Sequence, residues 1–181
     1  MLEDLIKVYK GKKVFLTGHT GFKGSWLTFL LSKLGAEICG YSLNPITEPS
    51  LYEEIKNHVI HQSIIGDIND KENLESAIVN FQPDFIFHLA AQPLVRESYI
   101  NPIGTISTNI LGTANLINSL LKIEKKCTSI LITTDKVYRN NEWHYPYRET
   151  DTLGGYDPYS ASKAASELII DSFRNSFFNL N

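Results

Sequence analysis

The chain has 181 residues, of which 43% are hydrophobic, and it carries a formal net charge of -3. This length suits about one domain with a sizeable core. Lysine and arginine are scattered along the chain instead of clustered, which excludes the basic surface that nucleic acid or an anionic membrane would need as a partner.

The first residues, MLEDLIKVYKGKKV, hold acids where a secretory signal would need a basic region before a long apolar one. No uninterrupted stretch of about 18 apolar residues occurs. Cys39 and Cys127 fall in or beside predicted strands without metal-ligand spacing, so we interpret both as structural thiols in a reducing compartment. We therefore expect a soluble cytoplasmic protein without a metal site.

Apolar runs alternate with amphipathic segments, which predicts repeated strand-helix units. Residues 13–17, KVFLT, are nearly all apolar, as in a parallel strand buried on both faces. A helix is expected from Phe22 to Leu34, closed by Gly35 in a left-handed cap. Residues 36–41 and 61–67 are the second and third predicted strands.

Asp70 is the predicted N-cap of a helix over residues 71–81, because apolar side chains recur there at helical spacing. Residues 84–90 form the fourth predicted strand. Asn101 is the predicted N-cap and Pro102 the first-turn residue of a long helix that extends to about Leu121.

Residues 129–134 are the fifth predicted strand, and an aromatic loop over residues 137–156 follows. The loop is too long for a simple connection, so we suspect a function for it. Asp157 and Pro158 begin a last helix with an alanine-rich apolar stripe. These elements predict an α/β fold: a Rossmann-like, doubly wound parallel sheet forming one NAD(P)-binding domain over residues 1–181.

The segment between the first strand and the first helix reads TGHTGFKG, with Gly18, Gly21 and Gly24 at intervals of three. Glycine there lets the chain turn sharply and lets backbone amides approach a pyrophosphate at the helix N-terminus. Because the triplet lies between a strand and a helix, it favours dinucleotide binding over a tight turn without a ligand.

The second strand is followed by Tyr41-Ser42-Leu43-Asn44. A carboxylate at this place would bind the ribose hydroxyls of NAD, and an arginine would accept the 2'-phosphate of NADP. Neither is present, so these residues do not choose between NAD and NADP; Ser42 or Asn44 can hydrogen-bond either ribose.

Tyr159 and Lys163 are four residues apart at the start of the last helix and share one face. A phenol is a poor base at its ordinary pKa of about 10, and a neighbouring cation favours its ionised form. Exposed pairs with this spacing are common as solvated helix neighbours, so a catalytic role depends on the rest of the pattern.

Four stretches together resemble the extended short-chain dehydrogenase/reductase family: the GxxGxxG of residues 18–24, GDI at 66–68, HLAAQ at 88–92 and the YxxxK of residues 159–163. The resemblance runs from Lys12 to Asn179. It implies NAD as cofactor, with Asp67 and Ile68 in contact with the adenine. It also implies that Asn109 orders a water or holds the backbone near the site, while a simple helix-surface role for Asn109 stays open. The implied cofactor-binding residues are Gly18, Thr20, Gly21, Phe22, Lys23, Gly24, Asp67, Ile68, Ala90, Ala91, Gln92, Asn109, Thr133, Tyr159 and Lys163.

The stretch ITTDKVY, at residues 132–138, resembles the end of the fifth strand in the sugar-nucleotide dehydratases of that family. Those enzymes place a Thr or Ser before two acids, whereas Lys136 here replaces the second acid. With GHTGFKGSW, QPLVRESY and GGYDPYSASK, this pattern implies a nucleotide-sugar 4,6-dehydratase with CDP-glucose as substrate. The implied catalytic residues are Thr134, Asp135, Lys136, Tyr159 and Lys163.

The resemblance implies that Asp135 protonates the leaving hydroxyl, and leaves Lys136 either as the base for the carbon 5 proton or as a cation that stabilises the enolate. Two other functions stay open: a nucleotide-sugar epimerase or reductase, and a non-catalytic NAD-binding module. Family members carry a smaller substrate domain after the YxxxK helix, which we expect to be absent here, so activity of this shorter chain is open. The family also implies a homo-oligomer through helices at 102–121 and 158–173.

Overall fold

The computed structural model describes residues 2–178; Met1 and residues 179–181, including Asn179 where the resemblance ends, lie outside the described residues. The chain divides into two compact units. Unit 1 comprises Met1–Ala90 and Ser119–Ile132, and unit 2 comprises Ala91–Asn118 and Thr133–Asn181. Within residues 2–178, no helix combines the length and the apolar character that crossing a membrane requires.

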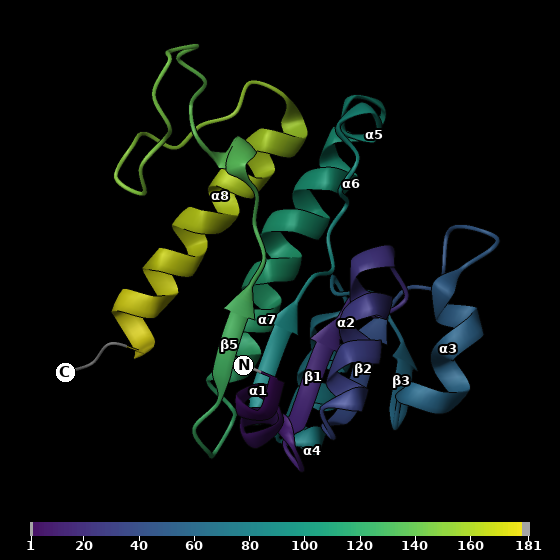
Figure 1. Cartoon of the computed structure of the whole chain (residues 1–181). Helices are drawn as coiled ribbons and strands as arrows, with labels where there is room; N and C mark the ends of the chain where they lie inside the picture. Colours follow the sequence, from purple (N-terminus) through teal and green to yellow (C-terminus); the bar gives the residue numbers. More distant parts are fainter. Residues whose placement is uncertain (1, 179–181) are drawn as a thin grey trace. The chain divides into compact units, whose positions relative to one another are not determined.

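Unit 1 is built on a five-stranded parallel sheet with the order β3-β2-β1-β4-β5 (Figure 1). Its strands are β1 (Lys13–Thr17), β2 (Glu37–Ser42), β3 (Gln62–Ile65), β4 (Phe85–His88) and β5 (Thr128–Leu131). The chain runs outward from β1 to β3 and then returns to place β4 on the other side of β1. This reversal confirms the predicted Rossmann-like sheet, and it marks the β1/β4 position as the place where ligands bind in such folds.

Side chains on β1 cover both faces of the sheet, because alternate residues of a strand point to opposite sides. Val14 and Leu16 cluster with Leu31 of α2 (Phe22–Lys33). Phe15 faces the other way, with its ring centroid 6.3 Å from that of Phe81 on α4 (Lys71–Phe81). All three β1 side chains are fully buried, which explains why the strand is apolar throughout.

Two of the four helices of unit 1 were predicted. Asp70 caps α4 by accepting a hydrogen bond from the backbone N–H of Asn73, and Gly35 beyond α2 has a φ of +81°. The helices α1 (Leu2–Tyr9) and α3 (Leu51–Val59) were not predicted. α1 buries no side chain, and α3 makes no side-chain capping bond and buries only two side chains, so the helix signal is weak in both segments.

Three predicted strands are longer than those observed, and most of the excess lies at their carboxyl ends. After β4 the backbone N–H of Ala90 donates to the side-chain oxygen of Thr17 instead of a ladder carbonyl. After β3, Asp67 turns the chain by accepting from the N–H of Asn69. After β5, the hydroxyl of Thr134 accepts from the N–H of Lys136 and opens a turn. At this edge, backbone N–H groups donate to side-chain oxygens instead of to carbonyls of the neighbouring strand, and each strand ends there.

Unit 2 is helical apart from one long loop. Its elements are α5 (Val95–Ile100), α6 (Pro102–Ile106), the π-helical turn η1 (Ser107–Leu111), α7 (Gly112–Leu120, whose last two residues count with unit 1), the 3-10 turn η2 (Asp135–Val137), α8 (Pro158–Phe173) and the π-helical turn η3 (Arg174–Phe178). The predicted helix from Pro102 is present but contains η1, which its sequence did not indicate. α5 was also not predicted, because six residues are too few for a helical period to stand out.

The aromatic loop predicted at 137–156 is irregular after Val137, which ends η2. Tyr138 pairs with Leu153 in an antiparallel bridge that closes the loop at its base. The ring of Tyr138 stacks on that of Tyr147 at 5.4 Å, and Trp143 lies 5.4 Å from Tyr147. Ring stacking of this kind adds to the backbone hydrogen bonds of the bridge in holding the loop.

Candidate functional site

The glycine loop follows β1 directly in unit 1, and its three glycines are needed for different reasons. Gly18 has a φ of +77°, and a Cβ there would lie 2.8 Å from the backbone N of Ala90. A Cβ on Gly24 would lie 2.0 Å from the carbonyl O of Gly18. A Cβ on Gly21 would meet only that same oxygen, at 3.4 Å. Packing within the chain thus explains Gly18 and Gly24, whereas the open space at Gly21 fits close approach of a ligand.

The first turn of α2 presents backbone N–H groups beside this open position. Gly21 is the N-cap and makes no side-chain capping bond, and Phe22 and Lys23 are exposed. The first N–H groups of a helix have no partner within it, and with the helix dipole they favour a phosphate. The loop therefore fits the pyrophosphate of a dinucleotide.

Thr20 fixes the loop to the end of β2. Its hydroxyl donates to the carbonyl of Leu43 at 2.8 Å, and the hydroxyl of Ser42 donates to Thr20 at 2.9 Å. Thr20 and Ser42 are both buried. Of the two residues expected to reach a ribose, Ser42 is thus engaged within the chain, while Asn44 is exposed.

His19 is a loop residue that the sequence pattern did not single out. Its buried ring packs on Gly40, where a Cβ would lie 2.3 Å from the ring, and its Nε2 is 2.8 Å from the Oγ of Ser63. That oxygen is also 2.8 Å from the hydroxyl of Tyr52 on α3. Burial lowers the pKa of His19 to about 4, against a smaller opposing effect of the Tyr41 backbone. A neutral imidazole therefore joins the glycine loop to β3 and α3.

The remaining predicted cofactor residues of unit 1 lie at the same carboxyl edge of the sheet. Ala90 approaches Gly18 and is held by Thr17, as described above. Asp67 is exposed, and its Oδ1 accepts from the backbone and the side chain of Asn69. Ile68 is only 4% exposed, so it belongs to the core. The turn role of Asp67 is thus visible, and its contact with adenine stays a prediction.

In unit 2, Asn109 clamps the segment that contains Ala91 and Gln92. Its Oδ1 accepts from the backbone N–H of Gln92 at 2.8 Å, and its Nδ2 donates to the Gln92 carbonyl at 3.2 Å. The same Nδ2 donates to the hydroxyl of Ser162 on α8 at 2.8 Å. Asn109 is 1% exposed. These bonds support the expected role of holding the backbone, and they disfavour the helix-surface alternative.

The predicted catalytic residues all belong to unit 2, where η2 packs against α8. Asp135 and Lys136 lie exposed on η2, and the hydroxyl of Thr134 donates to Asp135 at 3.0 Å. Tyr159 is partly buried and Lys163 is 4% exposed, both on α8. The acid-lysine turn and the YxxxK helix are therefore neighbours within one compact unit.

Thr133 was predicted to contact the cofactor, which stays a prediction, and its hydroxyl donates to the carboxylate of Glu167 on α8. Glu167 was not identified from the sequence, although it follows Lys163 by four residues and so shares its helix face. Ser162 was also missed. For Glu167 the available signal was its spacing of four residues from Lys163, whereas no local signal distinguished Ser162 from the other serines of α8.

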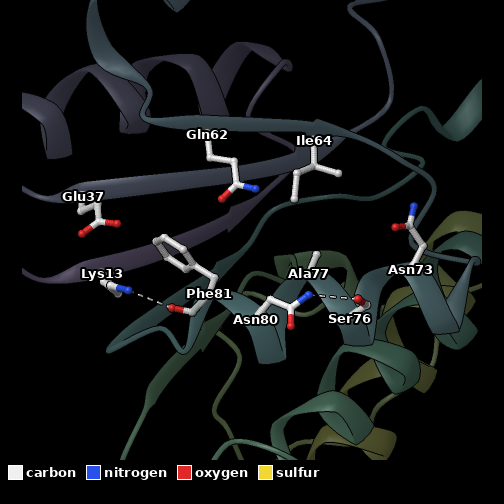
Figure 2. A pocket seen from close by; sticks show the side chains of 9 residues that line it. All are labelled: Lys13, Glu37, Gln62, Ile64, Asn73, Ser76, Ala77, Asn80 and Phe81. Atoms are coloured by element: carbon white, nitrogen blue, oxygen red, sulfur yellow. Dashed lines mark hydrogen bonds between the residues drawn. The ribbon is translucent and has the colours of Figure 1, made fainter.

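A hollow of about 390 Å³ lies elsewhere on unit 1, along α4 and the neighbouring strands (Figure 2). It is lined by Lys13, Glu37, Gln62, Ile64, Asn73, Ser76, Ala77, Asn80 and Phe81. Lys13 begins β1, whereas the glycine loop follows the other end of that strand. None of the predicted site residues lines this hollow. Within residues 2–178, no three His, Cys, Asp or Glu side chains come together to hold a metal ion.

The family described as GDP-mannose 4,6 dehydratase matches residues 15–179 of the chain. The chain belongs to this family. The chain is 50% identical to the CDP-glucose 4,6-dehydratase of Salmonella typhimurium over 171 residues, which are 94% of this chain and 48% of that enzyme. The predicted resemblance is thereby confirmed. The chain spans about half the length of the curated relatives it matches.

Two solved structures of nucleotide-sugar enzymes share the fold of this family member. The UDP-glucose 4-epimerase of Thermotoga maritima, determined with UDP-glucose, is 25% identical with a TM-score of 0.79, covering 91% of this chain and 52% of that one. MoeE5 in complex with UDP-glucose and NAD is 26% identical with a TM-score of 0.73, covering 89% of this chain and 48% of that one.

Proposed function

We propose that the chain supplies the cofactor-binding and catalytic residues of an NAD-dependent 4,6-dehydratase that converts CDP-glucose to CDP-4-keto-6-deoxyglucose. The observation that carries the proposal is the 50% identity to a CDP-glucose 4,6-dehydratase across 94% of this chain. The packing of the Asp135-Lys136 turn against the helix of Tyr159 and Lys163 supports it, because elimination needs both an acid and a redox base.

NAD would be held in unit 1 by the glycine loop and by the N-terminus of α2, where Gly21 leaves room for its pyrophosphate. Asp67 and Ala90 are the further contacts in this unit that the family pattern proposes. When bound, this cofactor supplies a reversible hydride acceptor, through which hydrogen leaves carbon 4 of the sugar and returns at carbon 6. The complex of MoeE5 with NAD supports the choice of NAD.

Tyr159 is proposed to remove the proton from the 4-hydroxyl as that carbon is oxidised. Its phenol must be ionised, and a nearby ammonium group favours the ionised form. Lys163 lies one turn along the same helix and is the proposed cation. Burial lowers the pKa of Lys163, and the carboxylate of Glu167 opposes this effect.

The elimination step is proposed for the residues of η2. A ketone at carbon 4 acidifies the proton on carbon 5, which Lys136 accepts if it is neutral; as a cation, Lys136 instead stabilises the enolate. Asp135 donates a proton to the 6-hydroxyl, which leaves as water. The hydroxyl of Thr134 donates to the carboxylate of Asp135 and orients it. An epimerase has no step that needs an acid beside the strand.

Cofactor binding is tested by titrating the purified chain with NAD in a calorimeter. Gly21→Val fills the open position of the loop and should weaken NAD binding by at least tenfold. Lys33→Ala, at the far end of α2, is the matched control and should bind NAD as the wild type does. Equal affinities in the two variants would remove the glycine loop from the cofactor site.

The reaction is tested by incubating the chain with NAD and CDP-glucose and following the absorbance of the 4-keto sugar. Tyr159→Phe should abolish product formation while NAD stays bound. Lys136→Ala should slow the exchange of the carbon 5 proton in deuterated water, and normal exchange would exclude Lys136 from that step. A 4-epimer as product would favour the epimerase, and NAD binding without any product would favour the non-catalytic module.

We also propose that two copies of the chain associate through helices of unit 2. The face of α5 and α6 carries exposed apolar side chains, of which Tyr99, Ile100 and Ile103 are each at least 67% exposed, and Leu168 of α8 is 60% exposed. Water-exposed apolar groups in such number favour a partner surface. Light scattering of the wild type and of Ile103→Asp should give a dimer and a monomer; a monomeric wild type would contradict the proposal.

A further inference from the structure

Glu167 lies on α8, one turn after Lys163, at a position to which the dehydratase scheme gives no role. Its side chain is partly buried. The carboxylate accepts a hydrogen bond from the hydroxyl of Thr133, a residue 34 positions earlier in the chain. A carboxylate on a solvated helix face would not need such a partner, so Glu167 connects two separate segments of unit 2.

The segment that Glu167 holds leads directly into the proposed acid-base turn. Thr133 is followed by Thr134, whose hydroxyl accepts from the N–H of Lys136 and donates to Asp135. The helix on the other side of the connection carries Tyr159 and Lys163. Glu167 therefore joins the two sets of catalytic candidates through one hydrogen bond, in addition to the packing of η2 on α8.

The carboxylate of Glu167 also interacts electrostatically with the ammonium group of Lys163. Lys163 is 4% exposed, burial lowers the pKa of its ammonium group, and the carboxylate of Glu167 raises that pKa. The other elements packed against α8 also carry charged or titratable groups. Those groups are Asp135 and Lys136 on η2, Arg96, Glu97 and Tyr99 on α5, and Arg174 on η3, which pairs with Asp171 of α8 itself. α6 and η1 have no titratable side chain.

We infer that Glu167 is a positioning residue that fixes the turn of Asp135 and Lys136 against the helix of Tyr159 and Lys163, and that places a carboxylate beside the Lys163 ammonium group. This inference rests on the proposed dehydratase function for its chemical meaning. Its structural content concerns only the side chains of unit 2. A lysine that keeps its proton can favour the phenolate of Tyr159, and a lysine without Glu167 would lose that proton at lower pH.

Two variants test separately the electrostatic effect of Glu167 on Lys163 and its positioning of the Asp135-Lys136 turn. Glu167→Gln keeps an oxygen that can accept from Thr133 but removes the charge. Thr133→Val keeps the charge and the shape but removes the donated hydrogen bond. Asp171→Asn is the matched control, because it removes an exposed carboxylate one turn further along the same helix.

The first measurement is the titration of Lys163 followed by NMR of the Cε resonances in lysine-labelled protein, with the peak assigned by its absence in Lys163→Arg. In Glu167→Gln the titration should move to lower pH than in the wild type, because the carboxylate that raises the pKa of Lys163 is then removed. Glu167→Asp should move it in the same direction by a smaller amount, and Asp171→Asn should leave it unchanged. An unchanged titration in both Glu167 variants would overturn the electrostatic part.

The second measurement is hydrogen-deuterium exchange of the backbone over residues 134–137. In Thr133→Val the amides of this segment should exchange at least several-fold faster than in the wild type, because the hydrogen bond from residue 133 to α8 is lost. Exchange at the wild-type rate would overturn the positional part. Neither measurement needs cofactor or turnover. Absence of dehydratase activity in the wild type would therefore contradict the proposed function while leaving these two results to decide the role of Glu167.

In an active preparation, Glu167→Gln should in addition move the alkaline limb of the pH profile of kcat to lower pH. The reason is that Lys163 would lose its proton earlier as the pH rises. A uniform fall in kcat without a shift of that limb would indicate a purely structural role and would count against the inference.

Discussion

The buried imidazole of His19 makes the stability of unit 1 depend on pH in a calculable way. Burial lowers the pKa of His19 from 6.5 to about 4. The unfolded chain binds a proton near pH 6.5, whereas the folded chain does not bind one until about pH 4. Stability conferred by the neutral ring is therefore complete above pH 6.5 and is lost as the pH falls toward 4.

The size of the effect follows from the shift. One pKa unit corresponds to about 1.4 kcal/mol, so the whole shift is worth about 3 kcal/mol, of which about 2 kcal/mol is lost between about pH 7 and pH 5. We expect His19→Gln to be less stable at neutral pH, because it loses the ring that packs on Gly40. Its free energy of unfolding should nevertheless fall by about 2 kcal/mol less than that of the wild type over this interval.

The assay is urea unfolding at several pH values, monitored by the fluorescence of Trp26. Trp26 lies on α2 in unit 1, and a Trp143→Phe background removes the other tryptophan, which lies in unit 2. His144→Gln, in the exposed loop, is the control that removes one histidine without touching the glycine loop. If His19→Gln and the wild type lose equal stability between pH 7 and pH 5, the argument from the buried neutral ring is wrong.

Three further substitutions test the packing and capping described above. Gly24→Ala forces a Cβ toward the carbonyl of Gly18 and should destabilise the chain by about 1–3 kcal/mol in urea unfolding, and a variant as stable as the wild type would contradict the close approach. Asn109→Ala leaves the Gln92 backbone without its partners and should cost about 2–4 kcal/mol, while retention of the wild-type melting temperature would show that the clamp is dispensable. Asp70→Ala removes the cap of α4 and should cost about 1 kcal/mol, which circular dichroism during thermal unfolding can detect; no loss would mean that water replaces the cap.

Local chemistry explains which parts of the fold were predictable. The strand β1 was predicted with its observed bounds, because a short run of consecutive apolar residues is typical of a parallel strand that is buried on both faces. The starts of α4 and α8 were also predicted, since Asp70 and Asp157 each accept a hydrogen bond from a backbone N–H three residues later. Such capping interactions depend only on neighbours in sequence, and the residue types alone indicate them.

The unpredicted features depend on residues distant in sequence. The π-helical turn around Asn109 contains no proline or other local breaker, and its asparagine binds Gln92 and Ser162, which are 17 and 53 positions away. The hydroxyl of Thr133 donates to Glu167, 34 positions later in the chain, while the cofactor contact that the resemblance implies for Thr133 stays a prediction. A side-chain donor takes whichever acceptor the folded chain brings to it.

The sequence alone determined the parallel sheet, the glycine loop after β1 and the tyrosine-lysine pair on one helix face, because spacing along a strand or a helix fixes which side chains are neighbours. Only the tertiary structure decided that Gly18 and Gly24 are required by contacts within the chain while Gly21 is open, that His19 is buried and neutral, and that Glu167 faces both Thr133 and Lys163. Burial and contacts across long stretches of sequence set these properties, and neither follows from the local pattern of residues.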